Sequence, residues 1–195
     1  MSASSRFLVA LIVGFIFIWM ALPVQPVHAA SITVTTTADT VSSDGLCSLR
    51  EAIANANNDV ATNLDCAAGS GADTISFSVN GAITLTSTLS ITDTLTINGN
   101  GSANTIIQAN ANANIAIFRV FTVSTGTLTL DGLQVRNGGN DSSFASNGGC
   151  MAVGVNTGLT LQNGVIVTGC RTTGPADGAA ISANTGTTVT ITDIT

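Results

Sequence analysis

Most of this chain alternates apolar with polar residues over short distances. Segments such as Leu95-Thr96-Ile97 and Leu128-Thr129-Leu130 place a large aliphatic residue at every second position and Thr or Ser between them. This period of two is typical of a strand with one buried face. Gly, Asn, Asp and Ser separate the segments, which favours turns between them. The other expected strands are 32–37, 75–79, 83–85, 89–91, 106–107, 115–118 and 121–123.

One stretch, residues 47–57, follows a different period. Its apolar residues fall at i, i+3, i+4 and i+7, which predicts an amphipathic helix whose stripe consists of Leu49, Ala52, Ile53 and Ala56. Ser48 and Glu51 have the spacing of a capping box at the helix start. We expect Glu51 and Asn55 to lie away from the stripe. A helix this short is stable in water only when its apolar stripe packs against other elements. We therefore expect it to cap one end of the stacked strands.

Arg50 is unusual because a cation in the first turn opposes the helix dipole. It therefore needs a carboxylate partner, and Asp39 and Asp44 lie just upstream. We favour a structural ion pair over a catalytic role, since the planar guanidinium matches a carboxylate.

The strands also repeat over a longer distance. Blocks beginning at residues 95, 128, 159 and 189 are variants of one pattern, separated by 33, 31 and 30 residues. A period near 30 that holds three short strands predicts the coil of a parallel β-helix. We expect an all-β fold with one short capping helix, divided into 31–70 (strand and cap) and 71–195 (coils). The pattern stops within a strand, so we expect a fragment of a longer repeat protein, or stacking on further coils or another copy.

Residues 1–30 have the features of a signal peptide. Arg6 precedes an apolar run from 7 to 22, and Val27-His28-Ala29 provides a small-residue cleavage pattern. We expect cleavage after Ala29 or Ala30, with an uncleaved anchor as the alternative. The mature protein is then secreted or held at the cell surface, without membrane insertion.

Export makes disulfides the favoured state of the four cysteines. We expect Cys47–Cys66 and Cys150–Cys170 pairs, and the alternative is four small buried thiols. No C-x-x-C spacing is present, so a zinc site is not expected.

Charged residues make up only 8% of the chain, and its formal net charge is −6. After the signal peptide its only cations are Arg50, Arg119, Arg136 and Arg171, which argues against nucleic acid as a partner. No cofactor is expected. Calcium beside the cap is the alternative, held by Asp39, Asp44, Asp59 and Asp65, although their spacing matches no calcium loop and favours solvated loops.

The residues Cys47-Ser48-Leu49-Arg50-Glu51-Ala52 resemble the CSLREA-type N-terminal domain of exported bacterial proteins. The segments Asp73-Thr74-Ile75-Ser76-Phe77 and Leu95-Thr96-Ile97-Asn98-Gly99 are similar to the same family. This resemblance implies a right-handed, pectate-lyase-like β-helix, similar to the repeats of polymorphic outer membrane proteins, in large surface or secreted proteins of mostly unassigned activity.

Two functions follow from these patterns. The first is a non-catalytic, adhesin-like scaffold that meets extracellular carbohydrate or protein. The second is a lyase or glycoside hydrolase acting on an acidic polysaccharide, which needs a base and a charge neutraliser, or two spaced carboxylates. Its candidate residues are few: Asp131, Arg136, Asp141, Arg171 and Asp177. Each is also typical of a solvated turn, so the scaffold is favoured.

Overall fold

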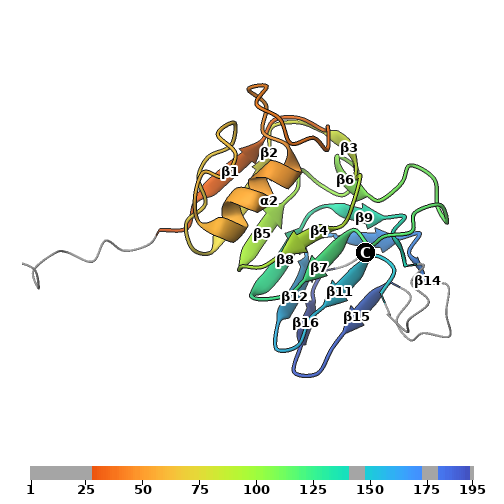
Figure 1. The fold of residues 1–195 in the computed structure, drawn as a ribbon. Coiled ribbons are helices and arrows are strands. Elements are labelled where there is room, and N and C mark those ends of the chain that lie inside the picture. Colours follow the sequence, from red (N-terminus) through yellow and green to blue (C-terminus); the bar gives the residue numbers. More distant parts are fainter. Residues whose placement is uncertain (1–27, 141–147, 173–179, 194–195) are drawn as a thin grey trace, which may run out of the picture.

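The computed structural model describes residues 28–140, 148–172 and 180–193, and these residues form mostly β structure with a single helix (Figure 1). The helix α2 spans Leu49–Asn58. The strands are β1 (Ser31–Val34), β2 (Asp73–Phe77), β3 (Gly81–Thr84), β4 (Leu89–Ile91), β5 (Leu95–Asn98), β6 (Thr105–Gln108), β7 (Phe121–Val123), β8 (Thr127–Asp131), β9 (Gln134–Arg136), β10 (Gly139–Asn140), β11 (Met151–Val153), β12 (Gly158–Gln162), β13 (Ile166–Thr168), β14 (Arg171–Thr172), β15 (Ile181–Ala183) and β16 (Thr188–Ile191).

All strand pairs among the described residues are parallel. They form a six-stranded sheet in the order β1-β2-β5-β8-β12-β16 and two four-stranded sheets, together with the short pair β10-β14. We call the four-stranded sheets the β3 sheet (β3-β6-β9-β13) and the β4 sheet (β4-β7-β11-β15). From β2 onward the chain visits the six-stranded sheet, the β3 sheet and the β4 sheet in turn, and then returns to the first.

The six-stranded sheet keeps one register throughout. Leu95 faces Leu128, Leu128 faces Leu159, and Leu159 faces Val189, so the predicted separations of 33, 31 and 30 residues are the distances between paired strands. A second row of matching positions consists of Ile32, Ile75, Ile97, Leu130, Leu161 and Ile191. Between these rows lies a hydroxyl row of Ser31, Thr74, Thr96, Thr129, Thr160 and Thr190.

Burial follows the alternation. Ile97 and Leu130 are fully buried, whereas the threonines between the aliphatic rows are half-buried or exposed. The other two sheets contribute matching rows to the same core, with Ile107 and Val135 from the β3 sheet and Phe121 and Met151 from the β4 sheet. Alternating sequence thus places one aliphatic face of every sheet in a shared interior.

One expected strand is absent. Residues 115–118 pair with no sheet, and Ile115 and Ile117 are 59% and 65% exposed. The segment is fixed instead through Ala116, whose carbonyl accepts from Arg171 Nη2 at 3.3 Å and packs against Gly139. A Cβ at Gly139 would lie 1.9 Å from this carbonyl oxygen, so the close approach requires glycine. The strand predicted at 115–118 from alternation alone was therefore wrong.

Both expected disulfides are present, Cys47–Cys66 and Cys150–Cys170. Across the described ranges, no helix is long and apolar enough to cross a membrane.

Candidate functional site

The helix α2 packs against β4, the edge strand of the β4 sheet, and also contacts β1 and β2 (Figure 1). At one end of the helix, Arg50 donates to the carbonyls of Ser87 (2.8 Å) and Thr88 (3.4 Å). At the other end, the Asn57 amide donates to Ser90 O at 2.8 Å and accepts from Thr92 N at 2.9 Å. These side chains satisfy backbone groups along the edge of β4, as a pairing strand would.

Asp39 holds Arg50 in this position. The two side chains form a two-point pair, with Nε to Oδ1 at 2.9 Å and Nη2 to Oδ2 at 2.8 Å. The Asp39 side chain is only 2% exposed, and its Oδ2 also accepts from the amide and hydroxyl of Thr86. Burial by itself would raise the pKa of Asp39, but the hydrogen bonds from Arg50 and Thr86 and the Arg50 charge outweigh it and lower that pKa. Of the two expected partners, Asp39 is therefore the one that Arg50 uses.

The predicted capping box is present at the start of α2. Ser48 Oγ accepts from Glu51 N, and Glu51 Oε2 accepts from Ser48 N at 3.0 Å. Glu51 also accepts from Ser42 N through Oε1 at 2.8 Å, so it fixes the preceding loop as well. Leu49 and Ile53 are buried in the core as predicted.

Two residues outside the apolar stripe of the helix are also buried. Glu51 is 2% exposed and Asn55 is fully buried, which the stripe alone did not predict. The Asn55 amide donates to the carbonyls of Asn63, Cys66 and Ala67, and its oxygen accepts from Asn63 N. Loops therefore cover this side of the helix, and one asparagine satisfies their backbone groups. The periodicity gives no sign of these loop contacts.

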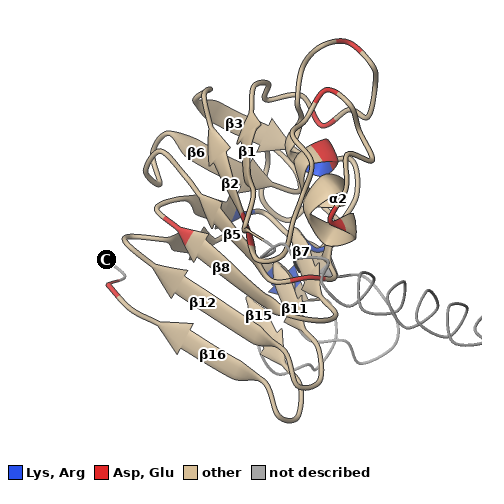
Figure 2. Cartoon of the chain, turned by 90° about the vertical axis from the view of Figure 1, so that its left-hand side faces the viewer, with Lys and Arg blue, Asp and Glu red and all other residues tan. Residues whose placement is uncertain are grey.

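The loops on either side of α2 are joined to each other. The Cys47–Cys66 disulfide connects them covalently, and Asp65 Oδ2 accepts from the amides of Asp44 (2.8 Å) and Gly45 (3.0 Å). Asp59, the left-handed C-cap residue of α2, accepts from Gly71 N. Figure 2 shows acidic positions of the ribbon, in red, on α2 and on the loops around it. In the described part of the chain, these carboxylates form no group of three suited to a metal ion.

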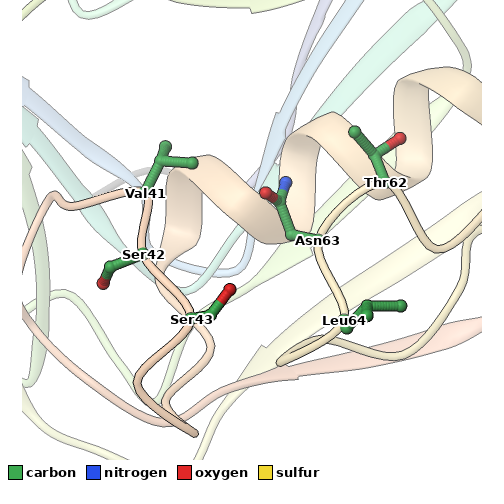
Figure 3. Close-up of a pocket in the computed structure, with 6 residues that line it drawn as sticks. All are labelled: Val41, Ser42, Ser43, Thr62, Asn63 and Leu64. Atoms are coloured by element: carbon green, nitrogen blue, oxygen red, sulfur yellow. The ribbon is translucent and has the colours of Figure 1, made fainter.

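A cavity of about 290 Å³ opens between the two loops (Figure 3). Its lining residues are Val41, Ser42, Ser43, Thr62, Asn63 and Leu64. Val41 and Leu64 are 61% and 87% exposed, so the cavity has an aliphatic rim and a polar wall. Hydroxyl and amide groups of this kind bind small polar ligands through hydrogen bonds, but none of the six lining side chains titrates near neutral pH.

The candidate catalytic residues lie on different sheets. Asp131, in β8, accepts from Gln162 Nε2 and Asn163 Nδ2, both at 2.8 Å. Arg136, in β9, donates from Nε to Gln108 Oε1 at 2.7 Å. Arg171 lies in β14 and contacts Ala116 as described above. Asp141 and Asp177 lie outside the described residues. The hydrogen bonds of Asp131 and Arg136 join neighbouring strands of their own sheets.

Comparison with known proteins adds no relative. No protein-family model matches the chain, and neither the curated proteins nor the solved structures contain a significant match.

Proposed function

We propose that this protein is a secreted or cell-surface scaffold whose described part is non-catalytic. Its body is a right-handed parallel β-helix, closed at one end by α2. The observation that carries the proposal is the in-register row of six parallel strands, aliphatic inside and hydroxyl-rich outside, with α2 over the first strand of a neighbouring sheet.

The cyclic order of the three sheets supports the β-helix. Each return to the six-stranded sheet is a parallel crossover, and such connections are right-handed in almost all proteins. The cap motif Cys47-Ser48-Leu49-Arg50-Glu51-Ala52 supports membership of the CSLREA-type group.

The two disulfides support an oxidising location, as expected for an exported protein. We propose that the protein binds an extracellular carbohydrate or protein through the hydroxyl row of the six-stranded sheet. Calcium has no part in this proposal.

Incubation with acidic polysaccharides separates the scaffold from the enzyme. The oxidised protein is mixed with polygalacturonate and related uronates, with and without Ca²⁺, and unsaturated products and new reducing ends are measured. We expect no product above a heat-denatured blank. Product that disappears in an Arg136→Gln variant of unchanged melting temperature would overturn the proposal. Arg50→Lys, on α2 and not on the β3 sheet, serves as the control at a temperature where it is also folded.

A further inference from the structure

Asp73 is a buried carboxylate near the start of the folded part. It begins β2, is 1% exposed and lies beside the turn at 69–71. Its Oδ1 accepts from Ala30 N at 2.8 Å and from Ser70 N at 2.9 Å, and its Oδ2 from Ser70 N at 3.1 Å. In the described part of the chain, each of these three hydrogen bonds to Asp73 comes from a backbone N–H group. A buried carboxylate is costly when no cation accompanies it.

Both the N–H and the carbonyl group of Ala30 form hydrogen bonds within the fold. Its N–H binds Asp73, and its carbonyl accepts from Thr74 N at 2.9 Å, extending the pairing of β1 with β2 by one residue. His28 and Ala29 are exposed. The ordered pairing therefore starts at Ala30, directly after the small-residue pattern Val27-His28-Ala29.

The two candidate cleavage positions leave different hydrogen bonds in the mature protein. Cleavage after Ala30 would remove the acceptor of Thr74 N and one donor to Asp73. It would also place His28, which is not small, three residues before the cut, whereas cleavage after Ala29 places Val27 there.

We propose that a leader peptidase cleaves between Ala29 and Ala30, and that the new α-ammonium group of Ala30, which is half-buried, forms an ion pair with the buried carboxylate of Asp73. Water supplies the atoms: its hydroxyl joins the Ala29 carbonyl carbon, the C–N bond breaks, and its remaining proton passes to the Ala30 nitrogen. At neutral pH this amine takes up a third proton from solvent and becomes the α-ammonium group, while the new Ala29 carboxyl group loses one. A neutral amide donor thus becomes a cation at the same atom, and a charged donor makes the stronger hydrogen bond. The cleavage step rests on the proposed secretion, whereas the ion pair is tested independently of it.

The first experiment measures the N-terminus of the exported protein. The full chain is expressed with its own leader, and the mature product is examined by intact mass and N-terminal sequencing. A start at Ala30 is expected. An exported product that starts at Ser31 overturns the cleavage site while leaving secretion intact, and an unprocessed chain overturns both.

The second experiment uses the absence of lysine from the sequence, which makes the α-amine the only primary amine of the mature chain. Oxidised protein starting at Ala30 is compared with protein starting at Ala29, which carries its ammonium one residue further out. Labelling by an amine-reactive reagent at neutral pH should be about tenfold slower for the Ala30 start, because an amine held as ammonium by a carboxylate is less available for reaction. Equal rates in the two folded proteins would overturn the ion pair.

An Asp73→Asn substitution in both proteins completes a double-mutant cycle. In the substituted pair, the difference in labelling rate should disappear. With Asp73 present, the folding equilibrium constant should be about tenfold larger for the Ala30 start than for the Ala29 start, and this advantage should be absent from the substituted pair. If Asp73→Asn fails to fold, acetylation of the Ala30 amine in the unmodified sequence provides the same comparison. An acetylated protein as stable as the free-amine protein would contradict the proposal.

Discussion

At the scale of single residues, the pair of Asp39 and Arg50 links the cap to the sheets. Arg50 contacts a carboxylate upstream and two carbonyls downstream, so one guanidinium fork joins three segments. Lysine at this position would keep the charge but lose the planar two-point geometry.

The lowered pKa of Asp39 predicts a specific response to acid. A carboxyl group with a lower pKa in the folded than in the unfolded state contributes stability above its unfolded pKa of about 3.9, and this stability is lost as the pH falls through the folded pKa. Asp39→Asn should therefore lower the free energy of unfolding by about 1–3 kcal/mol at pH 7. Urea titrations between pH 7 and pH 2 should show the variant and the unmodified protein converging below about pH 4. A constant difference over this range would contradict the role of the Asp39 charge.

Asn57 shows how an element is completed by a single side chain. Its amide meets one carbonyl and one N–H of the β4 edge, as a strand would. We expect Asn57→Ala to cost about 1–3 kcal/mol, because it leaves edge groups of β4 without their partner.

The neighbouring Asn58 is the matched control for this substitution. Its side chain donates to Ala54 O, in the helix itself, and to Thr62 Oγ1, just after the helix, and it is exposed. Asn58→Ala should cost less than about 1 kcal/mol by chemical denaturation. Equal losses for the two variants would show that Asn57 does not act as a substitute for a strand.

The two disulfides should stabilise the elements they join. Cys47–Cys66 and Cys150–Cys170 close loops of 19 and 20 residues in sequence separation. On the loop-entropy model, each contributes about 3 kcal/mol. A Cys47→Ala, Cys66→Ala double variant should show this loss in a thermal melt, and Cys150→Ala, Cys170→Ala should show a similar one. A melting temperature insensitive to a reducing agent would contradict this prediction.

How much of these elements the sequence revealed depends on where their partners lie. The capping box of Ser48 and Glu51 is local, so its spacing was enough to predict it. Asn55 is buried by loop carbonyls at 63, 66 and 67, and a helical stripe contains no information about them. Residues 115–118 have the alternation of a strand but form none, although Gly139 N at the start of β10 donates to Phe118 O.

At the scale of the whole molecule, the rows of the six-stranded sheet lose their burial at β16. Leu159 and Leu161 are 1% and 3% exposed, whereas Val189 and Ile191, which match them in register, are 37% and 48% exposed. In Figure 1, β15 and β16 lie at the end of the stack opposite α2. The repeat spacing predicted the pairing of β5, β8, β12 and β16 correctly, because these strands reuse one sequence pattern, but it did not predict the pairing of β1 with β2 or of β2 with β5.

This gradient makes a prediction about matched alanine substitutions. Ile97→Ala removes a fully buried side chain and should cost about 2–5 kcal/mol, while Ile191→Ala, in the same row, should cost less than half as much. Urea denaturation at low protein concentration gives both values. Equal costs would show that another strand covers Ile191 in solution.

The parallel register of the six-stranded sheet also has a mechanical consequence. Strands that lie across the stack place their hydrogen bonds in series along it, so a force along the stack acts on every strand pair at once and the weakest pair opens first. Among the described pairs this should be β12–β16, because Val189 and Ile191 are the least buried side chains of their rows. The pairings from β5 to β16 each span 30 to 33 residues of chain, and an extended residue covers about 3.5 Å. Stretching should therefore lengthen the chain in steps, one for each strand pair that opens. The step that includes residues 150–170 should be shorter, because the Cys150–Cys170 disulfide prevents this loop from extending.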